Sequence, residues 1–211
     1  MLDFTQDKGA LTANLTTLQS LSAETNLFDA LYDTVDRLGA VDGRKYIILI
    51  STGRDTSSLK TLVQVEKKLQ ASKNIVIYSF STGQALRNYA ESHGLLSALC
   101  TATTIDPNCN FAFLQADNQM RSFARMTGGK SYFLVFRSSF KDAFADMAQT
   151  IRNQYSISYH PTNAKQDGSY RLIKIELVGE DGKPLKLRDE KGHEIKYQVV
   201  AREGYTARQA Q

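Results

Sequence analysis

The chain has 211 residues, 42% apolar and 23% charged, which gives room for one α/β domain with an appendage or for two small domains. No apolar run approaches the length needed to cross a bilayer, and no signal peptide is recognised at the start. The 26 basic and 22 acidic side chains are scattered along the chain and leave a net charge of +4, so nucleic-acid binding is not expected.

The first 40 residues carry two helical patterns. Leucine and valine recur three and four residues apart, which predicts helices over 8–21 and 27–38 after a short strand over 1–4. Thr25 or Asn26 is expected to cap the second helix. The acidic side chains of that helix fall off its apolar stripe and are interpreted as a solvated face; they are Asp29, Asp33 and Asp36.

Residues 46–50 are five consecutive apolar side chains, which predict a central strand that is buried on both faces. In an open α/β sheet, ligands gather just beyond the carboxyl ends of the strands. The loop that follows therefore holds the candidate binding residues Ser51, Thr52, Gly53 and Asp55. Asp55 is interpreted mainly as a cap for the next helix, through the backbone amides of that helix.

The middle of the chain alternates between helical and extended patterns, as expected for a parallel sheet with right-handed crossovers. Gly128 and Gly129 are interpreted as the C-cap of a helix. The predicted elements are a helix over 59–69, a strand over 74–80, a helix over 82–93, a helix over 115–126, a strand over 130–136 and a helix over 139–151 that follows Ser138.

From residue 154 the apolar period changes from helical to alternating. The pattern predicts strands over 155–159, 170–177 and 196–201, joined by turn-rich segments. We therefore expect an α/β domain over 1–153 and an antiparallel β extension over 154–205. The last residues, 206–211, are expected to be disordered.

Cys100 and Cys109 are the two cysteines, and they bracket a loop with the turn signal Asp106-Pro107-Asn108. The spacing is compatible with a local disulfide and equally with two free thiols. A disulfide would indicate an oxidising compartment.

The sequence lacks the patterns of the common catalytic classes. Its histidines, His93, His160 and His193, lie far apart, and HExxH, GxSxG, Walker A and CxxC motifs are absent. We therefore expect no enzyme. An enzyme that uses Thr52 and Asp55 at the end of the central strand is kept as an alternative.

Four stretches taken together resemble the von Willebrand factor A (vWA) domain, and in particular a bacterial VWFA-related group. They are LDFTQDKGAL, TNLFDAL, RKYIILISTGRDTSS and FARMTGGKSYF, and the ending QYSISYHPTN followed by DGSYRLIKIELV and VVAREGY is also similar. The resemblance implies a Rossmann-like sheet with helices on both faces and a metal-ion-dependent adhesion site (MIDAS) above it. It also implies that the chain begins near the third strand of the family and lacks the first strands.

The resemblance assigns specific roles at that site. Thr25 matches the metal-binding threonine of the family, whereas Thr52 stands where the family has a metal-binding aspartate. Asp55 is a candidate replacement, so the metal ligands expected are Thr25 and Asp55. The family's DxSxS motif does not occur, which implies a degenerate site with no certain cofactor. Mg²⁺ is expected only if such a motif exists upstream.

The function implied is a non-enzymatic protein-binding or adhesion domain. Its partner-binding residues would be Thr25, Asn26, Ser51, Thr52, Gly53 and Asp55. The alternative is a fragment of a Mg²⁺-dependent MIDAS adhesin or of a secreted assembly factor. The resemblance also implies an extracytoplasmic location, periplasmic or secreted, with a homodimer or a swapped strand as candidates for filling the missing sheet positions.

Overall fold

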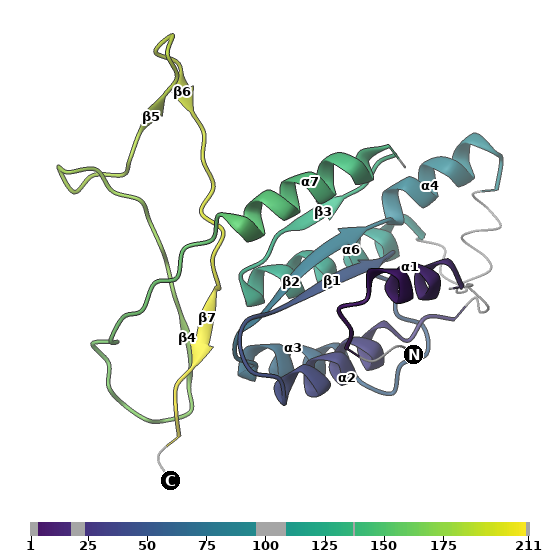
Figure 1. Cartoon of the computed structure of the whole chain (residues 1–211), viewed down its shortest axis with the longest axis horizontal. Coiled ribbons are helices and arrows are strands. Elements are labelled where there is room, and N and C mark those ends of the chain that lie inside the picture. The colour runs from purple at the N-terminus through teal and green to yellow at the C-terminus, as the bar shows by residue number, and fades with distance from the viewer. Residues whose placement is uncertain (1–3, 18–23, 96–108, 137, 210–211) are drawn as a thin grey trace.

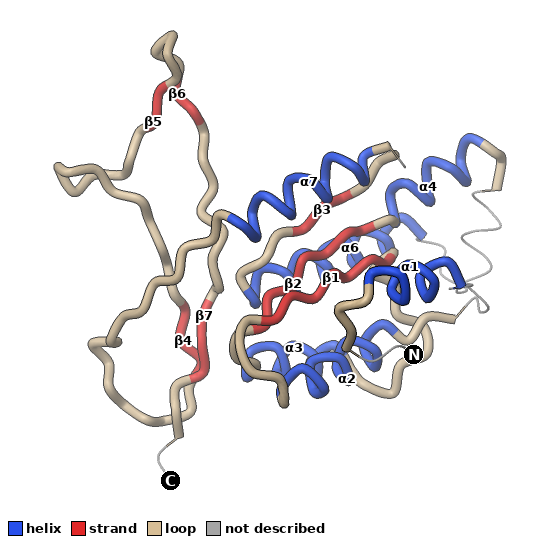
Figure 2. Tube along the Cα trace, viewed as in Figure 1, coloured by secondary structure: helices blue, strands red, loops and turns tan. Residues whose placement is uncertain are grey.

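A three-stranded parallel sheet forms the centre of the molecule (Figures 1 and 2). The computed structural model describes residues 4–17, 24–95, 109–136 and 138–209. The strands are β1 (Lys45–Ser51), β2 (Ile75–Ser81) and β3 (Ser131–Phe133), in the order β1-β2-β3. Ile47 lies opposite Ile77, and Ser81 lies opposite Phe133.

Helices cover both faces of this sheet. On one face, α2 (Leu27–Gly39), α3 (Leu62–Ala71) and α6 (Cys109–Thr127) enclose a core with Ile47, Ile75 and Ile77. On the other face, α7 (Ser139–Arg152) packs on Tyr78 and Phe80. Because side chains alternate along a strand, neighbouring residues of β2 supply both cores. Two further helices among the described residues are α1 (Lys8–Thr17) and α4 (Gly83–Ser92).

This arrangement confirms the predicted α/β class, with a parallel sheet and flanking helices that are compatible with a Rossmann-like fold. One feature of the prediction is wrong: β1 lies at the edge of the sheet that the described residues form, and it is not buried on both faces. Ile48 is 46% exposed and Ile50 is 52% exposed, because neither side chain joins one of the two apolar cores. No described helix is long and apolar enough to cross a membrane.

Several element boundaries differ from those predicted. The third helix begins at Leu62 and not at residue 59, because Thr61 and Gln64 form a capping box at its start. Helix α6 begins at Cys109, six residues before the predicted start, and β3 covers only three residues of the strand predicted over 130–136.

The two glycines after α6 confirm the predicted helix end. Gly128 has a φ of 81°, which is the left-handed conformation common at a helix C-terminus. At Gly129 a Cβ atom would lie 1.9 Å from the carbonyl oxygen of Ile77 in β2. Glycine is therefore required for the chain to pass this close to the sheet.

The C-terminal region is an antiparallel extension beside the sheet, as predicted (Figure 1). Strand β4 (Tyr170–Leu172) pairs with β7 (Gly204–Thr206), and β5 (Leu187–Arg188) pairs with β6 (Glu194–Ile195). The expected domain boundary at residue 205 falls inside β7.

Two strands predicted for this extension do not form. Residues 155–159 and 196–201 pair with no strand among the described residues. Tyr155 is 91% exposed and Ile157 is 72% exposed. The alternating pattern is present, but no second layer covers these side chains, so it does not produce a ladder.

Candidate functional site

The residues that enter α2 lie directly against the loop that follows β1. The Thr25 hydroxyl donates to the carbonyl oxygen of Arg54 at 2.8 Å, and the Thr25 carbonyl accepts from the backbone N–H of Thr56 at 2.9 Å. The Thr56 hydroxyl accepts from the backbone N–H of Thr25 at 2.8 Å. Two segments about 30 residues apart in sequence, both predicted to belong to the site, are thus joined by several hydrogen bonds, of which these are three.

Asp55 caps a helix, but not the one predicted. Its Oδ1 atom accepts from the backbone N–H of Phe28, in the first turn of α2, at 3.0 Å. The same carboxylate accepts from the Ser58 hydroxyl at 2.6 Å and from the Ser58 N–H at 3.3 Å. The following helix, α3, is capped instead by Thr61. Asp55 therefore stabilises the positive end of α2 from a separate loop.

Asp29, in the first turn of α2, makes the reverse contact and accepts hydrogen bonds from the loop. Its carboxylate accepts from the backbone N–H groups of Leu59 at 2.9 Å and Lys60 at 2.7 Å, and these bonds lower its pKa. The Ser58 hydroxyl accepts from the N–H of Asp29 at 3.1 Å. The interpretation of Asp29 as part of a solvated face is therefore incomplete. Together, Asp29, Asp55 and Ser58 hold the loop and the helix end in one arrangement, which we call the reciprocal cap.

The other predicted residues shape the start of the same loop. The Ser51 hydroxyl accepts from the N–H of Gly53 at 3.0 Å, and the Thr52 hydroxyl accepts from the N–H of Arg54 at 3.5 Å. Gly53 has a φ of 80°, and a Cβ atom there would lie 2.8 Å from the carbonyl oxygen of Ala116 in α6. The loop therefore needs glycine to pack against α6. Asn26 accepts a hydrogen bond from the Ser57 hydroxyl.

A second polar cluster lies at the end of β2. The Ser81 hydroxyl donates to Oδ1 of Asp117 in α6 at 2.5 Å. A guanidinium nitrogen of Arg87 lies 4.0 Å from the other carboxylate oxygen of Asp117, and Arg87 also donates to the side chain of Gln84. The guanidinium carbons of Arg54 and Arg87 lie 5.2 and 5.1 Å from the ring centroid of Phe113. Both arginines are thus placed for cation–π contact with one buried ring.

The sequence analysis did not identify Asp117 and Arg87 as site residues. Asp117 is 36 residues from Ser81 in sequence, so no local motif links them. A signal was nevertheless present, because Asp117 falls on the stripe of Phe113 and Met120, which are both fully buried in the structure. An acidic residue on an apolar helix stripe indicates a buried polar partner.

Thr25 and Asp55, the candidate metal ligands, would offer a magnesium ion one hydroxyl and one carboxylate. Mg²⁺ requires several oxygen ligands in near-octahedral geometry, with charge supplied by carboxylates. Thr25 uses its hydroxyl proton on a backbone carbonyl, and both carboxylate oxygens of Asp55 accept from N–H or O–H donors. Within the described part of the chain, no group of three or more His, Cys, Asp or Glu side chains is placed to hold a metal.

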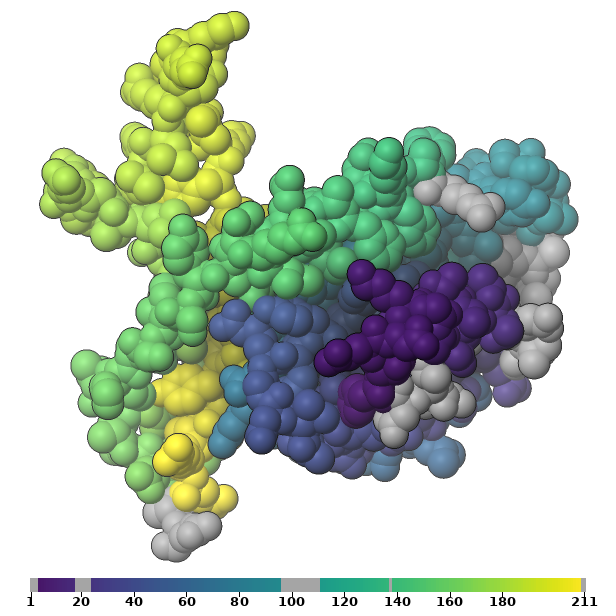
Figure 3. Space-filling view, viewed as in Figure 1, coloured from purple at the N-terminus to yellow at the C-terminus, as the bar shows by residue number. Residues whose placement is uncertain are grey.

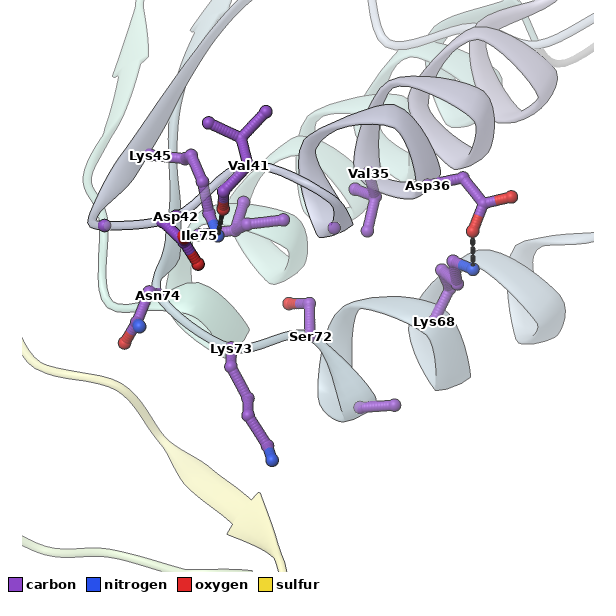
Figure 4. A pocket seen from close by; sticks show the side chains of 13 residues that line it. Val35, Asp36, Val41, Asp42, Lys45, Lys68, Ser72, Lys73, Asn74 and Ile75 are labelled. Carbon is purple, nitrogen blue, oxygen red and sulfur yellow. Dashed lines mark hydrogen bonds and ion pairs between the residues drawn. The ribbon is translucent and has the colours of Figure 1, made fainter.

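A pocket of about 360 Å³ lies at the opposite, amino end of β1 and β2 (Figure 4). Asp36 forms an ion pair with Lys68 across it, and the Lys45 ammonium donates to the carbonyl oxygen of Val41 at 2.8 Å. Figure 4 shows the Lys73 side chain extending away from this ion pair. Two of the three lysines that line the pocket are therefore already engaged.

The predicted cysteine pair lies outside the described residues. Cys100 belongs to the segment 96–108, and nothing is described of the Cys109 side chain. A disulfide and two free thiols therefore both remain predictions from the sequence.

The molecule is an α/β domain in which hydrogen bonds from side chains to the backbone hold the loop after β1 in place. Comparisons with models of protein families, with curated proteins and with solved structures find no match for the chain. The resemblance to vWA domains, which rests on the quoted sequence stretches, therefore stays a prediction.

Proposed function

We propose that this chain is a non-enzymatic, vWA-like protein-binding domain that docks a partner protein through the loops at the carboxyl ends of β1 and β2. The observation that carries the proposal is the position of Leu59. Its side chain is 91% exposed, although its own N–H and that of Lys60 are bonded to Asp29. Single exposed apolar side chains are common on protein surfaces, but this one is presented on a backbone that hydrogen bonds hold in place, so little ordering is needed before a partner binds.

The surroundings of Leu59 support a protein partner. Val63, in the first turn of α3, is 57% exposed. The reciprocal cap orders the loop before any partner arrives, so less conformational entropy is lost on binding. The predicted site residues Thr25, Asn26, Ser51, Thr52, Gly53 and Asp55 act in this proposal by shaping the loop, and exposed side chains make the contact.

The hydrogen bonding of the same loop argues for binding without metal. The candidate ligands Thr25 and Asp55 already hold backbone groups in place. Thr52 and Asp55, the residues of the alternative enzyme hypothesis, are not paired as nucleophile and base. Asp55 accepts from backbone amides and from the Ser58 hydroxyl, and the Thr52 hydroxyl accepts from the N–H of Arg54. The expected location, periplasmic or secreted, belongs to this proposal as well.

A photo-crosslinking amino acid placed at residue 59 tests the proposal in cells of the source organism. We expect one dominant protein adduct, identified by mass spectrometry and then purified for binding measurements. Leu59→Asp should weaken binding by at least about tenfold, as expected when the anchor of an interface is lost. Binding should be unchanged by EDTA.

The matched control is residue 157, where Ile157 is also strongly exposed but lies in the C-terminal extension. Equal crosslinking of the same protein from both positions would contradict a specific site at the loop. Loss of binding on chelation would overturn the metal-independent mode in favour of a Mg²⁺-dependent adhesion site.

A further inference from the structure

A cleft lies between the end of α3 and the C-terminal extension. It measures about 730 Å³, which is within the usual range for small-molecule sites. One wall is the end of α3 and its following turn, and the others come from the segment before β4 and from β7 with its flanks. In Figure 3 the green and yellow segments that form two of these walls lie side by side at the left of the molecule.

The charges that line this cleft are of one sign. Its lining contains five lysine or arginine side chains and one histidine, and no aspartate or glutamate among the described residues that form it. The basic side chains are Lys73, His160, Lys165, Arg171, Arg202 and Arg208. The chain as a whole carries nearly balanced charge, with 26 basic and 22 acidic residues, so this segregation is local.

Two of the arginines build the walls. Arg202 donates to the carbonyl oxygens of Leu69 and Gln70 at 3.2 and 3.0 Å, and thereby caps the negative end of α3. Arg171 donates to the carbonyl oxygens of Asn163 and Lys165, and lies 3.5 Å from a carboxylate oxygen of Asp167. Both side chains are fixed by these bonds and bring positive charge to the cleft.

The other four basic side chains have no structural role of this kind. Lys73, His160, Lys165 and Arg208 are exposed and take part in none of the ion pairs formed by the described residues. Figure 4 shows Lys73 extending away from the neighbouring 360 Å³ pocket, on the side of the yellow C-terminal segment. Like charges gathered on one cleft repel one another unless an anion binds there.

We propose that this cleft binds a small polyanion that carries phosphoryl groups. Lysine ammonium groups and the Arg208 guanidinium are the usual protein donors to phosphate oxygens, and Arg171 and Arg202 add to the positive field from fixed positions. Tyr205 also lines the cleft and can contact an apolar part of the ligand. The volume suits a metabolite-sized molecule better than a long nucleic-acid strand, which tracks an open surface.

The test is calorimetric titration of the full chain with inorganic tripolyphosphate, at low salt. The cleft variant is Lys73→Gln/Lys165→Gln/Arg208→Gln, which changes exposed side chains and keeps Arg171 and Arg202. The matched control is Lys67→Gln/Lys141→Gln/Lys186→Gln, which removes three exposed charges outside the cleft. We expect saturable binding that weakens about tenfold or more in the cleft variant and less than about threefold in the control.

Equal weakening in both variants would overturn the proposal, because it would indicate a general charge effect. Absence of saturable binding to the wild-type chain would overturn it directly. A single-stranded oligonucleotide added as competitor separates the two sources of phosphate. If it binds more than about tenfold tighter than tripolyphosphate, the cleft is a nucleic-acid surface and the small-molecule assignment is wrong.

Discussion

The sheet with its helices and the C-terminal extension use different forces to hold their shape. In the sheet, Phe80 is fully buried, with ring centroids 4.8 Å from Tyr132 and 4.5 Å from Phe144. In the extension, Leu172 of β4 is 75% exposed, although it lies in a paired strand. Apolar burial therefore stabilises the first region, whereas the second depends on a few polar contacts with the first.

Those contacts include Gln154 at the start of the extension, which accepts a hydrogen bond from the Tyr46 hydroxyl and donates one to the Tyr78 hydroxyl. Arg202 bonds to the end of α3, and Arg125 of α6 forms an ion pair with Glu203 at 3.2 Å. Gly128 allows the chain around Arg202 to pass close to the end of α6, since a Cβ atom there would lie 2.7 Å from the Arg202 nitrogen. An extension held this way can loosen without unfolding the sheet, and the predictions below test that difference.

The largest expected effect is in the sheet core. Phe80→Ala should lower the free energy of unfolding by about 3–5 kcal/mol, because it removes a buried aromatic ring and leaves a cavity. Leu172→Ala should change it by less than about 0.5 kcal/mol. Urea denaturation followed by far-ultraviolet circular dichroism measures both, since the chain contains no tryptophan. Similar losses for the two variants would break the comparison.

The next effect concerns the attachment of the extension. Arg202→Met removes the charged bonds to Leu69, Gln70 and Gly204, and should cost about 1.5–3 kcal/mol locally. Limited proteolysis should then cut within 154–201 about tenfold faster, while the sheet region stays intact. Arg188→Met, in the exposed β5 strand, serves as control. Simultaneous loss of both regions would show that they form one cooperative unit.

A third effect appears at high pH. Burial raises the pKa of Tyr132, and the hydrogen bond from its hydroxyl to Asp146 adds to the shift; burial also raises the pKa of Tyr78. Above the ordinary tyrosine pKa of 10.0, the unfolded chain has released protons that the folded chain retains. Stability should therefore fall as pH rises, by up to about 1.4 kcal/mol per pH unit for each tyrosine.

Denaturation curves measured at several pH values above about 9, where tyrosine titrates, give the slope of the unfolding free energy against pH. Tyr132→Phe should make the slope shallower, because the variant has one fewer phenol to ionise. Tyr155→Phe is the control, since Tyr155 is 91% exposed. A slope that responds equally to both substitutions would contradict the assignment to the buried ring.

The smallest effect is expected in the reciprocal cap. Ser58→Ala removes the acceptor for the N–H of Asp29 and a donor to Asp55, and should cost about 0.5–1.5 kcal/mol. Thermal denaturation measures the loss, with Ser156→Ala in the exposed extension as control. No difference between the two would mean that solvent replaces the Ser58 bonds without cost.

Much of the sheet region could be predicted because its signals are local. The apolar stripe of α2 and the apolar run of β1 fix both elements to within one residue of the structure. The extension is less predictable, since alternation over 155–159 and 196–201 specifies a strand only where a partner strand is available. The exposure of Ile48 and Ile50 was missed for a similar reason, because the sequence of a strand does not show which of its faces is covered by a helix.

The candidate site was predictable in outline only. The meeting of Thr25 with the loop after β1 was implied by the resemblance to vWA domains, whereas no predicted strand ends at Thr25. The partners of Asp29 and Asp55 could not, because Leu59 is 30 residues from Asp29, and Phe28 is 27 residues from Asp55. Both aspartates have common local explanations, solvation and capping of the next helix, which single-sequence reasoning prefers.

Residue-resolved amide hydrogen exchange by NMR, with and without millimolar Mg²⁺, tests the central claim most directly. The account predicts that the N–H groups of Phe28, Leu59 and Lys60 are protected, and that magnesium leaves their exchange unchanged. Asp29→Ala, which removes both acceptor oxygens, should release Leu59 and Lys60 while Phe28 stays protected. Fast exchange of Leu59 and Lys60 in the wild-type chain, or protection that changes with magnesium, would contradict a preformed, metal-independent binding loop.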